Sequence, residues 1–178
     1  MRIPCLPFLL SALITATAFA DALSPLPLPR PLHPLRPILT TTAIIEVYSG
    51  EAFEGIVLIE RGKAPFGIAI PGGKVEWGES VEGAVRREMR EETNLELTEL
   101  RQFHVYSDPM RDKRHHSIEV AFLAKATSSP VAGDDAKEAY IVPLDRIPWE
   151  KLAFDHERIL RDYLAFRAGD ATQAMAIP

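Results

Sequence analysis

The sequence predicts an α/β domain in which a mixed sheet is sandwiched between helices. Three observations support this class: apolar segments of strand length alternate with two helical segments, polar and Gly/Pro-containing turns separate them, and no internal repeat occurs. A chain of 178 residues with 47% hydrophobic and 25% charged residues suits one globular domain.

The first predicted elements are three strands. Residues 43–48 (AIIEVY) and 55–61 (GIVLIER) are rich in β-branched side chains and are joined by a polar turn. Residues 67–70 (GIAI) form a short apolar strand that leads into a Pro-Gly-Gly turn at 71–73. We therefore expect the folded domain to begin near Thr40.

The second half of the chain is predicted to alternate helices with longer strands. Its elements are a helix over 80–93, a strand over 95–107, a charged loop to 116, a strand over 117–126, a loop, a strand over 138–144 and a helix over 155–168 that Asp155 caps. Strands that alternate with two helices favour helices on both faces of the sheet.

Outside the folded domain, composition indicates two further kinds of segment. The N-terminus has an early positive charge, an apolar run from Leu6 to Ala20 and a small-x-small pattern before Asp21, which is typical of a secretory signal peptide. An uncleaved extension or a start codon placed too far upstream is the alternative. Six prolines follow and predict an extended linker. The expected parts are a signal-like segment (1–20), a Pro-rich linker (21–39), the folded domain (40–168) and a frayed tail (169–178).

Charge and cysteine content exclude several classes of function. The net charge is −5, and residues 1–36 hold three arginines against one aspartate, so residues 37–178 carry −7. Such acidity argues against a nucleic acid polymer as partner, and a protein of this charge that acts on phosphates needs a metal ion. Cys5, the single cysteine, cannot build a disulfide framework or a zinc cluster. Beyond the N-terminal segment no apolar run reaches the length of a stable membrane span.

The helix expected over 80–93 carries carboxylates on its apolar side. On a helical wheel, Val81, Ala84, Val85 and Met89 fall within about 140° of arc, and Glu88 and Glu92 fall inside the same arc. Two like charges on a half-buried face repel each other and lose hydration. Because no lysine or arginine shares that arc, a divalent cation is the natural compensator, and Mg²⁺ prefers carboxylate oxygens. The pattern predicts a metal-binding helix.

Residues around this helix complete the expected site. The two glycines at 72 and 73 allow the backbone to approach closely, so that they offer a carbonyl ligand or room for a phosphate. Glu79 and Ser80 begin the helix, and Arg87 is placed to pair with Glu79 and to hold the carboxylates in position.

The segment from Gly73 to Leu95 resembles the Nudix box, G-x5-E-x7-R-E-U-x-E-E-x-G-U, in which U is a bulky apolar residue. The matching residues are Gly73, Glu79, Arg87, Glu88, Met89, Glu91, Glu92 and Leu95. Asn94 replaces the late glycine of the pattern, and asparagine tolerates the left-handed backbone that this position requires.

The resemblance implies a Nudix-type α/β/α sandwich and hydrolysis of a nucleoside diphosphate linked to another moiety, with Mg²⁺ or Mn²⁺. It implies that Glu88 and Glu92 are metal ligands, that Glu91 is a ligand or takes part in activating water, and that the Gly73 carbonyl completes the coordination. Glu79 and Arg87 orient the set. In many relatives a further glutamate precedes a late strand as base or ligand, and Glu138 is the candidate here.

The outer segments are similar to the ADP-ribose pyrophosphatase branch of the family. Pro109 lies 14 residues after Leu95, near the position of a proline in ADP-ribose hydrolases, and Arg111 and Arg114 are candidates for contacts to the phosphate or ribose, unless this is only a solvated charged loop. The expected products are AMP and ribose 5-phosphate. Ile68 departs from relatives that place a tryptophan before the Pro-Gly-Gly turn, which leaves the base-stacking surface open.

Alternatives to this reading remain at the level of sequence. The chain could instead hydrolyse 8-oxo-dGTP or another nucleoside triphosphate, or sense nucleotide sugars without cutting them, although sensing domains typically lose box glutamates. Relatives often form homodimers. A cleaved signal peptide implies a periplasmic or secreted enzyme, whereas a misassigned start implies a cytoplasmic one.

Overall fold

The computed structural model describes residues 36–133 and 136–169 of the chain. The predicted signal-like segment, most of the linker, two residues of the loop before Glu138 and nearly all of the C-terminal tail lie outside these ranges. The folded region begins slightly earlier than expected, because the first strand starts at Ile38 rather than near Thr40. Within the described ranges, no helix has the length and apolar character needed to cross a membrane.

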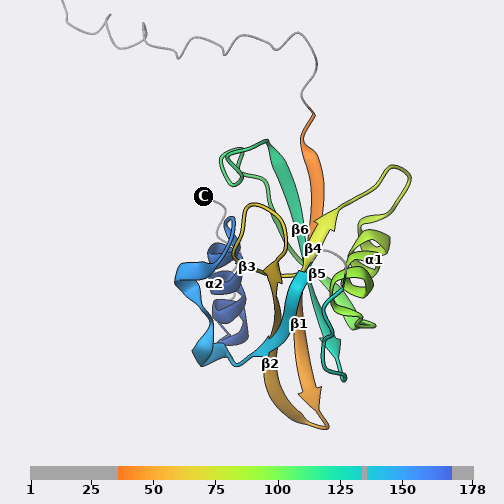
Figure 1. The fold of residues 1–178 in the computed structure, drawn as a ribbon, viewed down its shortest axis with the longest axis vertical. Helices are drawn as coiled ribbons and strands as arrows, with labels where there is room; N and C mark the ends of the chain where they lie inside the picture. Colours follow the sequence, from red (N-terminus) through yellow and green to blue (C-terminus); the bar gives the residue numbers. More distant parts are fainter. Residues whose placement is uncertain (1–35, 134–135, 170–178) are drawn as a thin grey trace, which may run out of the picture. The chain divides into compact units, whose positions relative to one another are not determined.

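Strands and helices follow the predicted order, with one further short strand, β4, where the sequence predicted only a Pro-Gly-Gly turn (Figure 1). They are β1 (Ile38–Ser49), β2 (Ala52–Arg61), β3 (Ile68–Ala69), β4 (Gly72–Lys74), α1 (Val81–Thr93), β5 (Thr98–Tyr106), β6 (Ser117–Ala126), β7 (Ala136–Val142) and α2 (His156–Arg167). Two short 3₁₀ helices that the sequence did not predict, Leu144–Arg146 and Trp149–Lys151, connect β7 to α2.

The strands form one mixed sheet of seven strands in the order β3-β2-β1-β6-β5, with β4 paired to β1 and β7 paired to β2. The central strand β1 runs parallel to β6 and antiparallel to β2 and β4. Because β4 takes over from β2 as the partner of the first half of β1, Gly72 and Gly73 lie beside Thr42 and Thr41. This register places the two glycines of the Nudix-like segment beside the central strand of the sheet.

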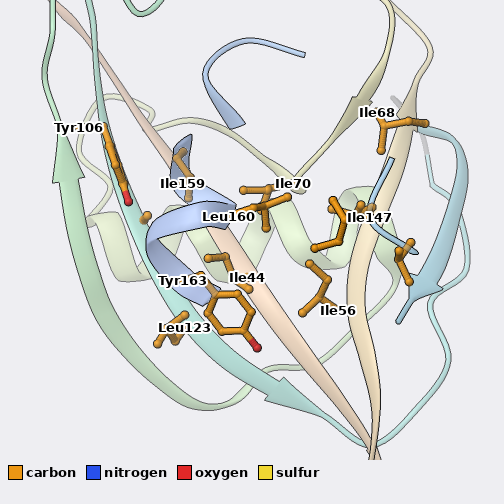
Figure 2. Packing of buried hydrophobic residues seen from close by; sticks show 13 residues of the cluster. Ile44, Ile56, Ile68, Ile70, Tyr106, Leu123, Ile147, Ile159, Leu160 and Tyr163 are labelled. Carbon is orange, nitrogen blue, oxygen red and sulfur yellow. The ribbon is translucent and has the colours of Figure 1, made fainter. Parts of the chain in front are cut away.

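Each face of the sheet packs against one helix, because successive side chains of a strand point to opposite faces. Ala43 and Ile45 of β1 pack with Val85 and Met89 of α1 in one buried cluster. The residues that alternate with them pack in a second cluster toward α2. Figure 2 shows this second cluster, in which Ile44 lies close to Leu160 and Tyr163. The predicted α/β/α sandwich is confirmed.

The N-terminus of α2 differs from the expectation. Asp155 occupies the N-cap position, but its side chain makes no capping hydrogen bond. Its two carboxylate oxygens instead accept hydrogen bonds from Arg111, at 3.0 and 2.7 Å. The prediction that Asp155 caps this helix through its side chain was therefore wrong, because a tertiary partner 44 residues away takes the carboxylate.

Candidate active site

Helix α1 is held at both ends by its own local chemistry. Ser80 is the N-cap residue, and its hydroxyl accepts a hydrogen bond from the Gly83 N–H at 3.0 Å. At the other end Asn94 adopts φ 54° and ψ 27°, and its N–H donates to the Arg90 carbonyl at 3.0 Å. Asparagine therefore takes the left-handed conformation for which the Nudix pattern uses glycine.

The buried face of α1 includes a glutamate. Ala84, Val85 and Met89 are fully buried, and Glu92 beside them is only 6% exposed. A carboxylate oxygen of Glu92 accepts a hydrogen bond from the Gly72 N–H of β4 at 2.8 Å. Any side chain at Gly72 would collide with the backbone of β1, so only glycine fits there. The wheel prediction that a carboxylate shares the apolar face is confirmed.

Arg87 connects three glutamates at the exposed edge of the same helix. Its Nε and one terminal nitrogen each donate to Glu79, both at 3.0 Å. The other terminal nitrogen donates to Glu88 at 2.8 Å and to Glu91 at 2.9 Å, and the Lys74 carbonyl accepts a further bond at 3.0 Å. These bonds to Arg87 lower the pKa of Glu79. The predicted Arg87–Glu79 pair is present.

Glu88 lies between this network and the glycine turn. Its side chain is 15% exposed, and burial raises its pKa although Arg87 acts in the opposite direction. A Cβ on Gly73 would collide with the Glu88 carboxylate, so the absence of a side chain at Gly73 makes room for that carboxylate. Glu88 is thus a half-buried acid whose negative charge is incompletely compensated.

A cavity of about 490 Å³ opens beside these groups. The box contributes Gly72, Gly73, Glu88 and Glu92 to its wall. Other parts of the chain contribute Thr40, Thr42, Arg61, Lys63, Arg111, Asp112, Arg114, Glu119, Phe154 and His156, among others. Carboxylates from α1 and cationic side chains from β2 and the loop before β6 therefore face one cavity.

Arg111 is buried within a separate charge cluster at the cavity wall. Its side chain is 5% exposed, and besides its paired bonds to Asp155 it donates to the Ser117 hydroxyl at 2.9 Å. Glu119, from β6, lies 3.4 Å away and accepts a hydrogen bond from the Thr40 hydroxyl at 2.7 Å. Burial raises the pKa of Glu119 to about 7, against the opposing effects of Thr40 and Arg111. This cluster ties the loop before β6 to the start of α2.

Arg114, in contrast, is half exposed at the cavity. Its guanidinium forms a paired interaction with the Asp112 carboxylate, with contacts of 3.0 and 2.7 Å. The bonds to Arg114 lower the pKa of Asp112 to about 2, so this carboxylate stays charged. The carboxylate thus holds the Arg114 side chain against its own loop.

The structure does not bring every predicted site residue to the cavity. Glu138 and Pro109 are exposed, and neither belongs to the described residues that line it. Glu138 lies on β7 opposite Glu60 of β2. Glu79 and Glu91 contact the cavity-lining Glu88 only through Arg87.

The sequence did not predict several residues that line the cavity, among them Arg61, Glu119, Phe154 and His156. His156 is buried, its Nδ1 accepts a hydrogen bond from the Ile70 N–H at 2.9 Å, and burial lowers its pKa to about 3. The available signal was Glu119, a charged residue at a buried position of a largely apolar strand. Phe154 and His156 become part of the site only through the docking of α2.

Comparison with known proteins identifies the family. The family model described as NUDIX domain matches residues 38–163. This chain belongs to the Nudix family. A protein named ADP-ribose pyrophosphatase from Methanocaldococcus jannaschii is 47% identical over 117 residues, which cover 64% of this chain and 68% of that protein. The predicted family is therefore confirmed, and the chain is a Nudix hydrolase.

Solved structures of Nudix proteins share the fold. A MutT/nudix family protein from Enterococcus faecalis is 30% identical with a TM-score of 0.63, covering 74% of this chain and 63% of that chain. The NUDIX domain of Shewanella oneidensis NrtR, complexed with ADP ribose, is 25% identical with a TM-score of 0.64, covering 72% and 89%. A bifunctional NMN adenylyltransferase/ADP ribose pyrophosphatase from Francisella tularensis, complexed with AMP and a Mn ion, is 25% identical with a TM-score of 0.63, covering 75% and 42%.

Proposed function

We propose that this Nudix hydrolase cleaves a nucleoside diphosphate linked to another moiety, with ADP-ribose as the lead substrate. Water would add to one phosphorus of the P–O–P anhydride, and the products would be AMP and ribose 5-phosphate. The observation that carries the proposal is the single cavity that carboxylates from α1 share with arginines from β2 and the loop before β6. The name of the M. jannaschii relative and the ADP-ribose and AMP ligands of two structural neighbours support it.

The residues present fit a divalent cation, Mg²⁺ or Mn²⁺, by the chemistry of the donor set. In the described part of the chain no three His, Cys, Asp or Glu side chains converge as a ready-made metal site. Glu88 and Glu92 nevertheless present carboxylates to the cavity from one face of α1, and desolvation disfavours the charge on Glu88. A hard cation offsets such a cost, and carboxylate oxygens are its preferred ligands. We propose that Glu88 and Glu92 hold the cation, with Glu91 and the Gly73 carbonyl as further ligands.

The chain's own residues position these ligands. Arg87 fixes Glu88 and Glu91 from one side, and Glu79 anchors Arg87 through two hydrogen bonds. The Gly72 N–H binds one oxygen of Glu92, so the carboxylates are held in position before the substrate binds. When bound, the cation neutralises phosphate oxygens and lowers the pKa of water.

Substrate contacts are proposed for the loop before β6. Arg114 is half exposed in the cavity wall, and its Nη1 lies outside the pair of donors that Asp112 binds, so this nitrogen is the one that we propose donates to a phosphate. Arg111 is engaged by Asp155, Ser117 and Glu119, so we propose that it serves the substrate by fixing this loop. Glu138 and Pro109, which are exposed and do not line the described cavity, stay predictions from the resemblance alone.

Turnover by the full chain tests the proposal. ADP-ribose, other nucleotide sugars, dinucleotides and 8-oxo-dGTP would be compared with Mg²⁺, with Mn²⁺ and with EDTA, and the products would be identified by chromatography. We expect preferred release of AMP from ADP-ribose only when a divalent cation is present. The Glu92→Gln variant should fold, since glutamine preserves the acceptor for the Gly72 N–H, and should lose activity by a factor on the order of 10³.

The other outcomes discriminate the alternatives. Preference for the triphosphate, with release of pyrophosphate, would keep the hydrolase and overturn the substrate. Saturable binding of ADP-ribose without turnover in either cation would overturn catalysis and leave a binding domain.

A further inference from the structure

Phe154, at the cavity wall just before α2, has an unusual backbone conformation. Its φ is 57°, in the left-handed region that bulky side chains rarely adopt. Phenylalanine has no short polar side chain to stabilise that conformation, unlike Asn94 at the end of α1. A residue keeps such a backbone conformation only when neighbouring contacts enforce it. Residues of this kind cluster at functional sites.

The segments on both sides of Phe154 are fixed by hydrogen bonds. The Ala153 N–H donates to the Ile68 carbonyl of β3 at 2.8 Å, and Leu152 forms a bridge with the same residue. On the other side, Asp155 is held by its two bonds to Arg111. These contacts determine where the Phe154 ring lies, namely in the wall of the cavity that the α1 glutamates share.

Two arginines from different segments lie over this ring. The guanidinium carbon of Arg61, at the end of β2, is 4.8 Å from the ring centroid, and that of Arg114, in the loop before β6, is 5.2 Å from it. Both distances are in the range of cation–π attraction. The Arg61 Nε also donates to the Pro65 carbonyl at 2.7 Å, and Asp112 holds Arg114, so each side chain is fixed at a second point.

We propose that Phe154 is a positioning residue that holds Arg61 and Arg114 together as a grip for one phosphate of the diphosphate substrate. This inference rests on the proposed function. Guanidinium groups bind phosphate oxygens through planar, paired donors, and an aromatic face orients them without competing for those donors. Because the ring is engaged by two cations, we assign it to the arginines rather than to a stacked nucleobase. Neither Arg61 nor Phe154 belongs to the Nudix box.

The chain contains a matched control outside the cavity. Arg161 lies 4.6 Å from the Trp149 ring centroid and is held by Glu157 four residues earlier, much as Arg114 is held by Phe154 and Asp112. Replacement of Arg161 by lysine therefore removes a stacked, carboxylate-bound guanidinium that has no part in the proposed grip.

The test is equilibrium binding of ADP to the full chain by calorimetry, in EDTA, so that no cation contributes to the affinity. Phe154→Leu and Arg114→Lys are each expected to raise Kd about tenfold, whereas Arg161→Lys should leave it unchanged within about twofold. Phe154→Tyr, which keeps the aromatic face, should retain the affinity. Phe154→Gly is a second route should the leucine variant not fold, because glycine adopts a φ of 57° readily and removes the ring.

A mutant cycle decides whether the ring acts through the arginines. We expect Phe154→Leu, added to a chain that already carries both Arg61→Lys and Arg114→Lys, to weaken ADP binding little further, because neither guanidinium remains for the ring to position. Multiplied effects would mean that Phe154 contacts the ligand itself and would overturn the positioning role. An unchanged Kd in both Phe154→Leu and Phe154→Gly would also overturn it. ADP binding that follows the expected pattern, without turnover of ADP-ribose, would leave the grip in place while the proposed function fails.

Discussion

Two arginines organise carboxylates on opposite faces of the sheet, and they do so with different consequences. Arg87, on the α1 side, keeps 23% of its side chain exposed and contacts three glutamates, of which Glu88 faces the cavity. Arg111, on the α2 side, is 5% exposed and joins segments distant in sequence. Arg87 thus positions the carboxylates of the proposed metal site, whereas Arg111 joins distant segments of the fold.

The largest expected effect comes from removing the buried arginine. Arg111→Ala leaves Glu119 and Asp155 without their partner, and loss of one side of a buried ion pair costs about 3–5 kcal/mol of unfolding free energy. Arg87→Ala should cost less, about 1 kcal/mol, because Arg87 is less buried than Arg111 and its partner Glu91 is half exposed. Urea denaturation of both variants measures the difference. Equal losses would show that the two clusters do not differ as their burial suggests.

For catalysis we expect the opposite order, with Arg87 contributing more than Arg111. Arg87→Lys keeps the charge but cannot bind Glu79, Glu88 and Glu91 at once, so the carboxylates lose their fixed positions. We expect kcat for ADP-ribose to fall by about 10²-fold, with the denaturation midpoint nearly unchanged. Arg90→Lys on the exposed side of the same helix is the control. A kcat equal to that of the unmodified protein would contradict a positioning role for Arg87.

Glu119 makes the α2-side cluster sensitive to pH. Its pKa is raised to about 7 in the folded protein by burial, so the folded state binds this proton more tightly than the unfolded state. The resulting stabilisation is complete below pH about 4.5 and is lost as pH rises toward 7. The loss amounts to roughly 3 kcal/mol from a shift of this size. The unfolding free energy of Glu119→Gln, relative to that of the unmodified chain, should therefore rise between pH 5 and pH 8.

Thermal or urea unfolding at both pH values, with the unmodified chain measured alongside, checks this expectation. A difference between the two proteins that does not change with pH would show that Glu119 is charged throughout. Glu99→Gln is a suitable control, because Glu99 is an exposed glutamate on β5.

The smallest expected effect concerns the N-terminal ends of the two helices. The end of α1 is held by a local hydrogen bond, and the end of α2 is held by a tertiary contact. Ser80 caps α1 with its own hydroxyl, whereas Asp155 gives its carboxylate to Arg111. Ser80→Ala should lower the unfolding free energy by about 1 kcal/mol, and Ser80→Asp, which can still accept the Gly83 N–H, should restore it. Chemical denaturation measures both. If Ser80→Ala lowered the unfolding free energy as much as Arg111→Ala, local and tertiary contacts would not differ in strength as we propose.

The sequence alone predicted the order of the strands and helices apart from β4, and it identified the residues that gather on and beside α1. Alternation of apolar residues, the glycine turn and the acid-rich helix all lie within short stretches of chain, where hydrogen bonding and side-chain periodicity act over a few residues. The Arg87–Glu79 pair was predictable for the same reason, since both residues lie in one turn-and-helix segment. The two 3₁₀ helices were missed because they have no periodic signal at three residues each.

Only the tertiary structure decided the other half of the cavity. Arg111 and Asp155 are 44 residues apart, and Thr40 and Glu119 are 79 apart. Their pairing follows from the parallel register of β1 with β6 and from the docking of α2, which depend on the packing of the whole core rather than on any local pattern. The same packing places Phe154 beside Arg61 and Arg114. The pairing of residues that meet only through long-range contacts leaves no local signal in a single sequence.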